Sequence, residues 1–319
     1  MSSHNSRQSL RSIQFFVAAY EEQSFTVAAM REHATQSGVS QHVSDLEDSL
    51  SVKLFERSSG SVQPTPAGTA YYSACIELLK AHERTLRAVE PFKGSRQSEI
   101  KVGMTPVMTR AVLAPAYARF TKQNPNVIVR IIDSYFGELT DRVRSGELTF
   151  AIVPSSIGSK GVRTSFFASA PEMLVSGRMS PFKHCQPLKL AQLPPLNLAI
   201  PGVSNARRKL IDAYITSNGI SIKSFAEFDT MAGTMDLVSR GEWVTILPMM
   251  MIVNDIDTGK YNINPIEDPP LILETFVIEP ARKTMTDVAV DFLECVKEEF
   301  AFSIAKATQL LKKEGLTQK

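Results

Sequence analysis

The 319-residue sequence predicts an α-helical N-terminal domain, a long linker helix and a C-terminal α/β domain with two lobes. Three observations lead to this fold class. Residues 9–50 show the apolar spacing of three short amphipathic helices. Residues 65–89 carry a single apolar seam along about seven helical turns. From residue 100 onward, predicted strands alternate with predicted helices, which is typical of βαβ units with a parallel sheet.

The overall composition indicates a soluble globular protein, since 43% of the residues are apolar and 21% are charged. No apolar run reaches the ~18 residues that a membrane span needs. The N-terminal segment MSSHNSRQSLRS lacks the apolar core of a signal peptide. We therefore expect a cytoplasmic protein that does not contact a membrane.

The three cysteines, Cys75, Cys185 and Cys295, lie far apart and form no CxxC pair. An odd, scattered set argues against a disulfide framework or a zinc site. Buried, incidental thiols are the favoured interpretation, and a redox sensor is the alternative. The sequence suggests no cofactor.

Charge gives little indication of nucleic-acid binding, because the whole chain carries a net charge of +2. Residues 1–68 contain five Lys or Arg and seven Asp or Glu side chains, a balance of −2. Nonspecific DNA binding depends on neutralising phosphates, so this domain should bind weakly alone and show a shallow salt dependence. Specific binding by a dimer remains possible.

The helix predicted over residues 36–50 has two distinct faces. The buried face carries Val39, Val43, Leu46 and Leu50. The opposite face carries short, uncharged side chains, and such Ser and Gln residues suit base edges in a major groove. An ordinary amphipathic surface helix is the competing interpretation. The residues of this face are Ser37, Ser40, Gln41 and Ser44.

Helix ends in the same region are marked by good capping residues. A first helix over residues 9–22 is followed by Ser24 as the N-cap of a second helix, and Thr35 is the predicted N-cap before Gln36. The acids Asp45, Glu47 and Asp48 fall in the C-terminal half of the third helix, where phosphates would repel them. Its neutral N-terminal half is therefore the part that could enter a groove.

After residue 50, residues 53–57 and 61–63 flank a Ser-Ser-Gly turn and predict a small hairpin. Arg57 is placed to contact a phosphate or a minor groove. A surface salt bridge with Glu56 or another acid explains Arg57 equally well.

The motifs F-T-x-A-A, T-Q-S-G-V-S-Q-H-V-x-x-L-E, L-F-E-R and T-P-A-G occur in this order between residues 10 and 68. This arrangement resembles the N-terminal domain of LysR-type transcriptional regulators. The resemblance implies a winged helix-turn-helix with reading positions at Gln36, Ser37, Ser40 and Gln41. Two features depart from the family pattern: Glu32 stands where Leu is usual, and the wing contains few basic residues.

The linker helix begins at Thr65-Pro66, an N-cap followed by proline at the first helical position, and should run to about residue 89. Two series of residues, each spaced by seven positions, form an a/d seam along this helix. We expect this seam to form a homodimer, as the resemblance also implies, with packing against the C-terminal domain as the alternative. A dimer would place two heads on two half-sites. The seam residues are Tyr72, Cys75, Leu79, His82, Leu86 and Val89.

Residues 90–98 break the helix and read as a hinge. The domains predicted are residues 1–65, the linker 66–94 and an α/β domain 95–319. Strands are expected at 100–104, 127–133, 150–153, 172–175, 196–200, 243–247 and 271–278, and helices at 107–122, 139–143, 206–216, 232–239 and 287–305. The middle section suits an inserted lobe, giving lobe I as 95–169 and 270–319 and lobe II as 170–269. This is the periplasmic-binding-protein architecture that LysR regulators carry.

Ligands of open α/β sheets bind outside the carboxyl ends of the strands, beside helix N-termini. Hydroxyl groups there suit a carboxylate and the apolar groups suit a carbon skeleton or ring, although any single hydroxyl can be an ordinary N-cap. Arg163 and Arg207 could pair with an anion, but we expect both at the surface. The predicted effector-binding residues are Thr105, Val107, Tyr135, Phe136, Ser155, Ser156, Ser204, Asn205, Thr230 and Met231.

Catalytic and nucleotide-binding motifs are absent from the sequence, which contains no GxGxxG, GxxxxGK[ST], GxSxG or HExxH. The predicted function is a LysR-type regulator that binds promoter DNA and a small, anionic effector, assembles as a dimer or tetramer, and recruits RNA polymerase. An α/β enzyme with a helical appendage and a DNA-organising protein that ignores effectors are the alternatives.

Overall fold

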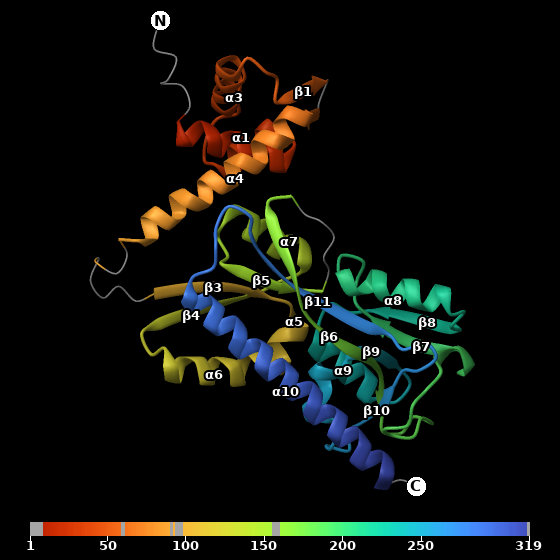
Figure 1. Cartoon of the computed structure of the whole chain (residues 1–319). Helices are drawn as coiled ribbons and strands as arrows, with labels where there is room; N and C mark the ends of the chain where they lie inside the picture. Colours follow the sequence, from red (N-terminus) through yellow and green to blue (C-terminus); the bar gives the residue numbers. More distant parts are fainter. Residues whose placement is uncertain (1–8, 59–60, 90–91, 93–97, 155–159, 318–319) are drawn as a thin grey trace, which may run out of the picture.

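The computed structural model describes residues 9–58, 61–89, 92, 98–154 and 160–317. At the N-terminus, helices α1 (Leu10–Glu22), α2 (Phe25–Arg31) and α3 (Gln36–Leu50) pack with a hairpin of β1 (Phe55–Ser58) and β2 (Ser61–Pro64). We call this unit the head. It lies at one end of the molecule, above the α/β domain (Figure 1).

The three predicted helix starts of the head are confirmed by their caps. The side chains of Ser9, Ser24 and Thr35 accept hydrogen bonds from the backbone N–H groups of Ser12, Val27 and Gly38, respectively. These caps satisfy donors that a helix N-terminus otherwise leaves unpaired. The predicted apolar faces of the first and third helices form the core of the head, in which Phe16, Val17, Val39, Val43 and Leu46 are fully buried.

The linker helix α4 spans Pro66–Arg87 and is capped by Thr65, as predicted. Its first half packs on the head of the same chain. Cys75 and Leu79 are buried there, and Tyr72 stacks on Tyr20 with ring centroids 4.0 Å apart. These three seam residues are therefore covered within one protomer, and only the later part of the predicted seam is left for a partner. The predicted hinge lies almost entirely outside the described residues.

Lobe I begins with β3 (Ser98–Met104), β4 (Val127–Asp133) and β5 (Phe150–Val153), which form a parallel arrangement around β3. Between β3 and β4, the predicted helix is interrupted: α5 (Pro106–Met108) leads through a π-helical turn at Thr109–Leu113 into α6 (Ala114–Gln123). Helix α7 (Phe136–Ser145) connects β4 to β5.

Lobe II contains β7 (Leu196–Ile200), α8 (Ala206–Ser217), β8 (Ile222–Glu227), α9 (Met231–Ser239) and β9 (Val244–Pro248). A 3₁₀ segment at Met249–Asp255 then leads into β10 (Tyr261–Pro265). Our sequence-based prediction missed β8 and β10.

Three elements pass between the lobes. Strands β6 (Val162–Gly177) and β11 (Ile272–Pro280) pair antiparallel, so the sheet is mixed rather than purely parallel as predicted. Its order is β4-β3-β5-β11-β6-β9-β7-β8, with β10 on β6. Helix α10 (Asp287–Thr317) is longer than predicted and packs on both α6 and the 3₁₀ segment of lobe II (Figure 1).

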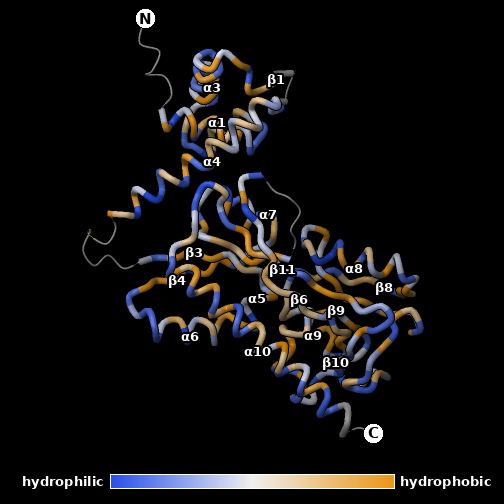
Figure 2. Tube along the Cα trace, viewed as in Figure 1, coloured by the Kyte–Doolittle hydropathy of each residue, from blue (hydrophilic) through white to orange (hydrophobic). Residues whose placement is uncertain are grey.

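Hydrophobic residues follow the strands and the inner faces of the helices, whereas hydrophilic residues lie on the outer loops (Figure 2). The largest core cluster extends from β3 and α6 through β6 to α10, which explains why the C-terminal helix belongs to both lobes. Among the described residues, no helix is long and apolar enough to cross a membrane.

Candidate functional site: a DNA-reading helix and an inter-lobe cavity

Helix α3 lies at the end of the head that points away from the lobes (Figure 1). Thr35, Gln36, Ser37 and Gln41 are exposed, and Ser40 and Ser44 are partly exposed. The amide nitrogen of Gln41 donates to Oδ1 of Asp45 over 2.9 Å, which fixes the direction of the side chain. The structure thus brings together every predicted reading position of this helix.

Glu47, in the acidic half of α3, has a structural role in the head. Its side chain is buried and accepts hydrogen bonds from the backbone N–H groups of Leu54 and Phe55 over 2.9 and 3.1 Å. Lys53 pairs with its other oxygen over 3.0 Å. This carboxylate holds the turn into the hairpin and does not face DNA.

The predicted wing is present as the antiparallel pair of β1 and β2, in which Arg57 is opposite Val62. The side chain of Arg57 lies outside the described residues. The unusual Glu32 ends α2 and pairs with Arg282 of lobe I over 3.1 Å. A leucine at this position would lack that charged partner.

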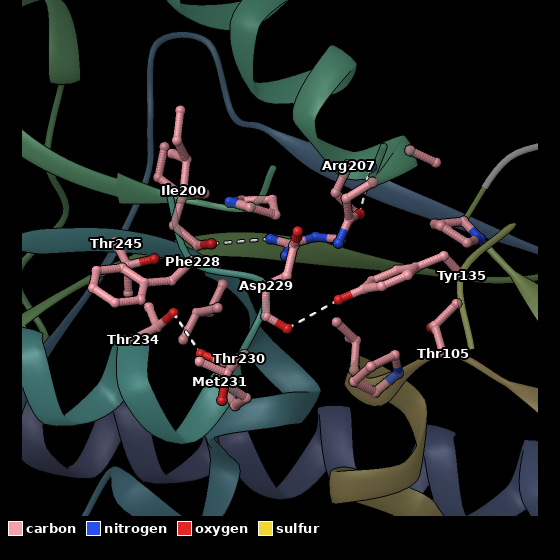
Figure 3. A pocket seen from close by; sticks show the side chains of 18 of the residues that line it. Thr105, Tyr135, Ile200, Arg207, Phe228, Asp229, Thr230, Met231, Thr234 and Thr245 are labelled. Atoms are coloured by element: carbon pink, nitrogen blue, oxygen red, sulfur yellow. Dashed lines mark hydrogen bonds between the residues drawn. The ribbon is translucent and has the colours of Figure 1, made fainter. Parts of the chain in front are cut away.

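Between the lobes, residues from both sides line a cavity of about 60 Å³ (Figure 3). This volume has room for a few water molecules. Helices α7, α8 and α9 all begin at the cavity, and their N-terminal N–H groups therefore point toward it. Seven predicted effector residues line it: Thr105, Val107, Tyr135, Phe136, Asn205, Thr230 and Met231.

A second, outer hollow of about 600 Å³ adjoins this cavity and shares Phe136, Pro154, Asn205 and Ala206 with it. Ser204 lines the outer hollow together with Lys209, and it does not line the inter-lobe cavity as we predicted. Ser155 and Ser156 lie outside the described residues. The sequence rule therefore selected the edge of the sheet where both hollows lie but did not separate them.

Arg207 is the residue that sequence reasoning placed wrongly, because the structure buries it. Its Nε and Nη2 atoms donate to the carboxylate of Glu172 over 2.8–3.0 Å, and Nη2 also donates to the carbonyl oxygen of Ile246. Nη1 has no hydrogen-bond partner among the described residues, although the side chain lines the cavity. By contrast, Arg163 is partly exposed and pairs with Glu279.

One hydrogen bond crosses the cavity from lobe to lobe. The hydroxyl group of Tyr135 in lobe I donates to the carbonyl oxygen of Asp229 in lobe II over 2.9 Å (Figure 3). Burial raises the pKa of Tyr135, and the carboxylate of Asp229 adds to the rise. The phenol therefore stays protonated and acts as a donor. Phe228, Asp229, Thr234 and Thr245 also line the cavity and were missed because they follow an unpredicted strand or lie within elements.

The cysteines are buried, free thiols, as the favoured interpretation expected. Burial raises the pKa of both Cys75 and Cys185 to about 11, so neither thiol forms a reactive thiolate near neutral pH. Among the described residues, no group of three His, Cys, Asp or Glu side chains could hold a metal ion.

A helix-turn-helix head joined by a long helix to a two-lobed α/β domain with an inter-lobe cavity defines a one-component transcriptional regulator. Comparison with protein families agrees. Residues 10–69 match the bacterial regulatory helix-turn-helix protein, lysR family, and residues 93–301 match the LysR substrate binding domain. The chain belongs to the LysR family of DNA-binding transcriptional regulators, and its relatives are regulators rather than enzymes.

Its relatives are distant but cover the chain well. The Hca operon transcriptional activator HcaR of Escherichia coli is 24% identical over 297 residues, which is 92% of this chain and 98% of the relative. The nitrogen assimilation regulatory protein nac of Klebsiella aerogenes is 25% identical over 75% of this chain and 78% of its own length.

Solved structures share the fold. Full-length BenM superposes with a TM-score of 0.57 at 20% identity, covering 92% of this chain and 97% of that chain. CbnR in complex with its target DNA has a TM-score of 0.52 at 19% identity, covering 92% of this chain and all of that one.

Proposed function

We propose that two copies of the chain read an interrupted palindrome in promoter DNA through Ser37, Ser40 and Gln41. The observation that carries this proposal is the exposed, uncharged N-terminal half of α3, a helix in the part of the head away from the lobes (Figure 1). The positive end of the helix dipole lies there, which favours nearby phosphates. Thr35, Gln36, Ser44 and the wing residue Arg57 complete the proposed contact set.

Replacement of Gln41 tests the reading helix. A glutamine that pairs with adenine contributes about 1–3 kcal/mol of discrimination, so Gln41→Ala should weaken binding to the protein's own promoter about tenfold or more. Its melting temperature should stay unchanged because Gln41 is exposed. Fluorescence anisotropy measures the affinity of the protein for promoter DNA and for random DNA, with Gln123→Ala on α6 as the matched control. Equal binding of the wild type to any DNA would instead favour a DNA-organising role.

We further propose that a small anionic effector, a carboxylate or aromatic acid, binds in the inter-lobe cavity. Tyr135 and Thr230 are N-caps whose side chains make no capping hydrogen bond, so the first N–H groups of α7 and α9 remain available to an anion. The free Nη1 of Arg207 adds a charged donor beside them. Phe136, Phe228 and Met231 supply apolar surface.

The hydrogen bond between Tyr135 and Asp229 gives the proposal a mechanism. An effector that contacts Tyr135 and Asp229 competes with the hydrogen bond that joins the two lobes across the cavity. Effector binding that breaks this hydrogen bond therefore favours a different angle between the lobes. In the proposed dimer or tetramer, this change alters the spacing of the heads, the bend of the DNA and the recruitment of RNA polymerase in the cytoplasm.

A thermal-shift series tests the effector site. A ligand at 100 times its Kd stabilises the native state by about 2.7 kcal/mol, which is a shift of several degrees. The probes are sodium benzoate, sodium salicylate and aliphatic mono- and dicarboxylates. We expect Thr105→Val/Thr230→Val to abolish the shift and Ser204→Ala/Lys209→Gln, in the outer hollow, to retain it. The reverse pattern would move the effector to the outer hollow, and no shift with any acid would contradict an anionic effector.

A further inference from the structure

The head rests on lobe I through a cluster of charged side chains. Nε of Arg144 lies 3.1 Å from Oε1 of Glu22, and Nη1 of Arg282 lies 3.1 Å from Oε1 of Glu32. Arg31 of the head stands between them, 2.6 Å from Glu21 and 2.9 Å from Glu22. We call Glu21, Glu22, Arg31, Glu32, Arg144 and Arg282 the docking cluster.

The docking cluster is enclosed, unlike most surface ion pairs. The side chains of Glu21, Arg31 and Glu22 are only 1%, 6% and 7% exposed. Burial lowers the pKa of Arg31, but the two glutamates outweigh this effect and raise it, so the guanidinium stays charged. Buried pairs are screened little by salt, and removal of one partner leaves the other charge uncompensated.

Three further contacts join the head to lobe I beside the docking cluster. Gly161, just before β6, approaches the head so closely that an added Cβ would lie 2.6 Å from Cδ of Glu21. The ammonium group of Lys160 lies over the ring of Tyr20, 5.3 Å from its centroid. Ala281, which follows β11, is buried in the hydrophobic core of the head. Charged, polar and apolar contacts therefore coincide at one interface.

Helix α7 connects this interface to the effector cavity. Its first residue, Phe136, lines the cavity, and Arg144 in its last turn pairs with Glu22. The carbonyl oxygen of Ser145 accepts a hydrogen bond from Arg282, which also pairs with Glu32. Ten helical residues span about 15 Å. Figure 1 shows α7 on the side of lobe I that faces the head.

We propose that the docking cluster fixes each head to its own lobe I, and that α7 transmits movement from the effector cavity to the head within a single protomer. The transmission, but not the docking, rests on the proposed effector function. This route acts in addition to the linker helix. A helix is stiff along its axis, so displacement of the Phe136 end moves the Arg144 end and with it Glu22. The cluster also explains why the head is acidic: three of its seven carboxylates face lobe I rather than DNA.

Hydrogen exchange on the full-length protein tests the docking. In Arg144→Gln/Arg282→Gln, amides of residues 280–285 and of the α1–α2 turn should exchange at least tenfold faster, while those of β3 and β5 stay unchanged. Arg142→Gln is the matched control, because Arg142 lies on the same helix but pairs with Glu138 and Glu147 of lobe I. The charge exchange Glu32→Arg/Arg282→Glu should restore protection relative to Arg282→Glu alone. Unchanged exchange in the double variant would overturn the docking.

DNA affinity tests the transmission. With an acid that shifts the melting temperature of the wild type, promoter affinity should change severalfold on ligand addition. In Arg144→Gln/Arg282→Gln the thermal shift should persist, whereas the change in promoter affinity should fall below twofold. A full ligand-dependent change in this variant would overturn the α7 route. If no acid stabilises the wild type, the effector proposal and the transmission both fail, while hydrogen exchange still decides the docking.

Discussion

At the scale of single residues, Arg207 and Glu172 show what spacing cannot predict. The two side chains stand 35 positions apart and meet because α8 packs over β6. A buried guanidinium is tolerated only when its charge is compensated and its donors are satisfied. Sequence alone offered an arginine in the first turn of a helix, for which a surface position is the default.

Because Arg207 and Glu172 compensate each other, the effects of replacing them on the free energy of unfolding should not add. Arg207→Met leaves the carboxylate of Glu172 buried and unpaired, which should lower the free energy of unfolding by about 3–5 kcal/mol. The double variant Arg207→Met/Glu172→Met removes both charges and should recover most of this loss. Urea denaturation of both proteins measures the difference. Equal destabilisation of the single and double variants would show that the pair does not act as a unit.

Glu32 shows how a departure from a family pattern can be informative. Leucine is usual at this position, so the sequence predicted that a charged carboxylate would stand where an apolar side chain is normally buried. The structure resolves this problem by supplying Arg282 from lobe I, 250 residues further along the chain. Only the folded arrangement of both domains reveals this partner.

At the scale of elements, the T-P-A-G motif has a steric explanation. The linker helix starts so close to the carbonyl oxygen of Leu54 that a Cβ at Gly68 would lie 2.1 Å from it. Gly68→Ala should therefore destabilise the head by about 3 kcal/mol, at the upper end of overpacking effects.

Gly137 in α7 is the matched control, because a Cβ there would meet nothing within 4 Å. Gly137→Ala should stabilise the protein by up to about 1 kcal/mol, since alanine favours the helix. Circular dichroism during thermal unfolding compares the two. Similar effects of both substitutions would contradict the close approach at Gly68.

Elements with clear periodicity were predictable, and those without it were not. The strands at 127–133, 150–153 and 196–200 were predicted with the observed bounds because they are short apolar runs. Strand β8 was missed because it is a largely exposed edge strand with polar residues. Strand β10 was missed because it contains Asn262 and Asn264, buried asparagines whose amide groups donate to loop carbonyl oxygens.

At the scale of the whole molecule, the linker helix limits how copies can assemble. Tyr72, Cys75 and Leu79 are used within the protomer, whereas Leu78 and Leu86 of the same helix are 45% and 50% exposed, so we expect a partner helix to pack on these two leucines. These residues lie on one helical face. The sequence pattern identified the seam but could not divide it between internal packing and a partner.

We therefore expect Leu78→Glu/Leu86→Glu to convert the dimer to a monomer without loss of folding. Charges at these positions would be desolvated in a helix pair but remain solvated in a monomer. Sedimentation equilibrium measures the mass, with Ser73→Glu, at an exposed position on another face of the same helix, as the control. A dimer that survives the double substitution would place the interface elsewhere.

The inter-lobe cavity is also a property of the whole molecule, since it forms where loops from both lobes meet. The rule that ligands bind at the carboxyl ends of strands identified seven of its residues. It could not identify Asp229, because Asp229 follows strand β8, which was not predicted. It could not identify Thr245, because Thr245 lies within strand β9 rather than in a loop.

The contact between Glu32 and Arg282 has a practical consequence for exchanging modules among such regulators. Consider a hybrid protein that joins the head of another LysR regulator to the α/β domain of this chain at the linker. A donor head with the usual leucine at position 32 would leave Arg282 without its carboxylate. Working hybrids should therefore require either a grafted glutamate at this position or a neutral replacement for Arg282.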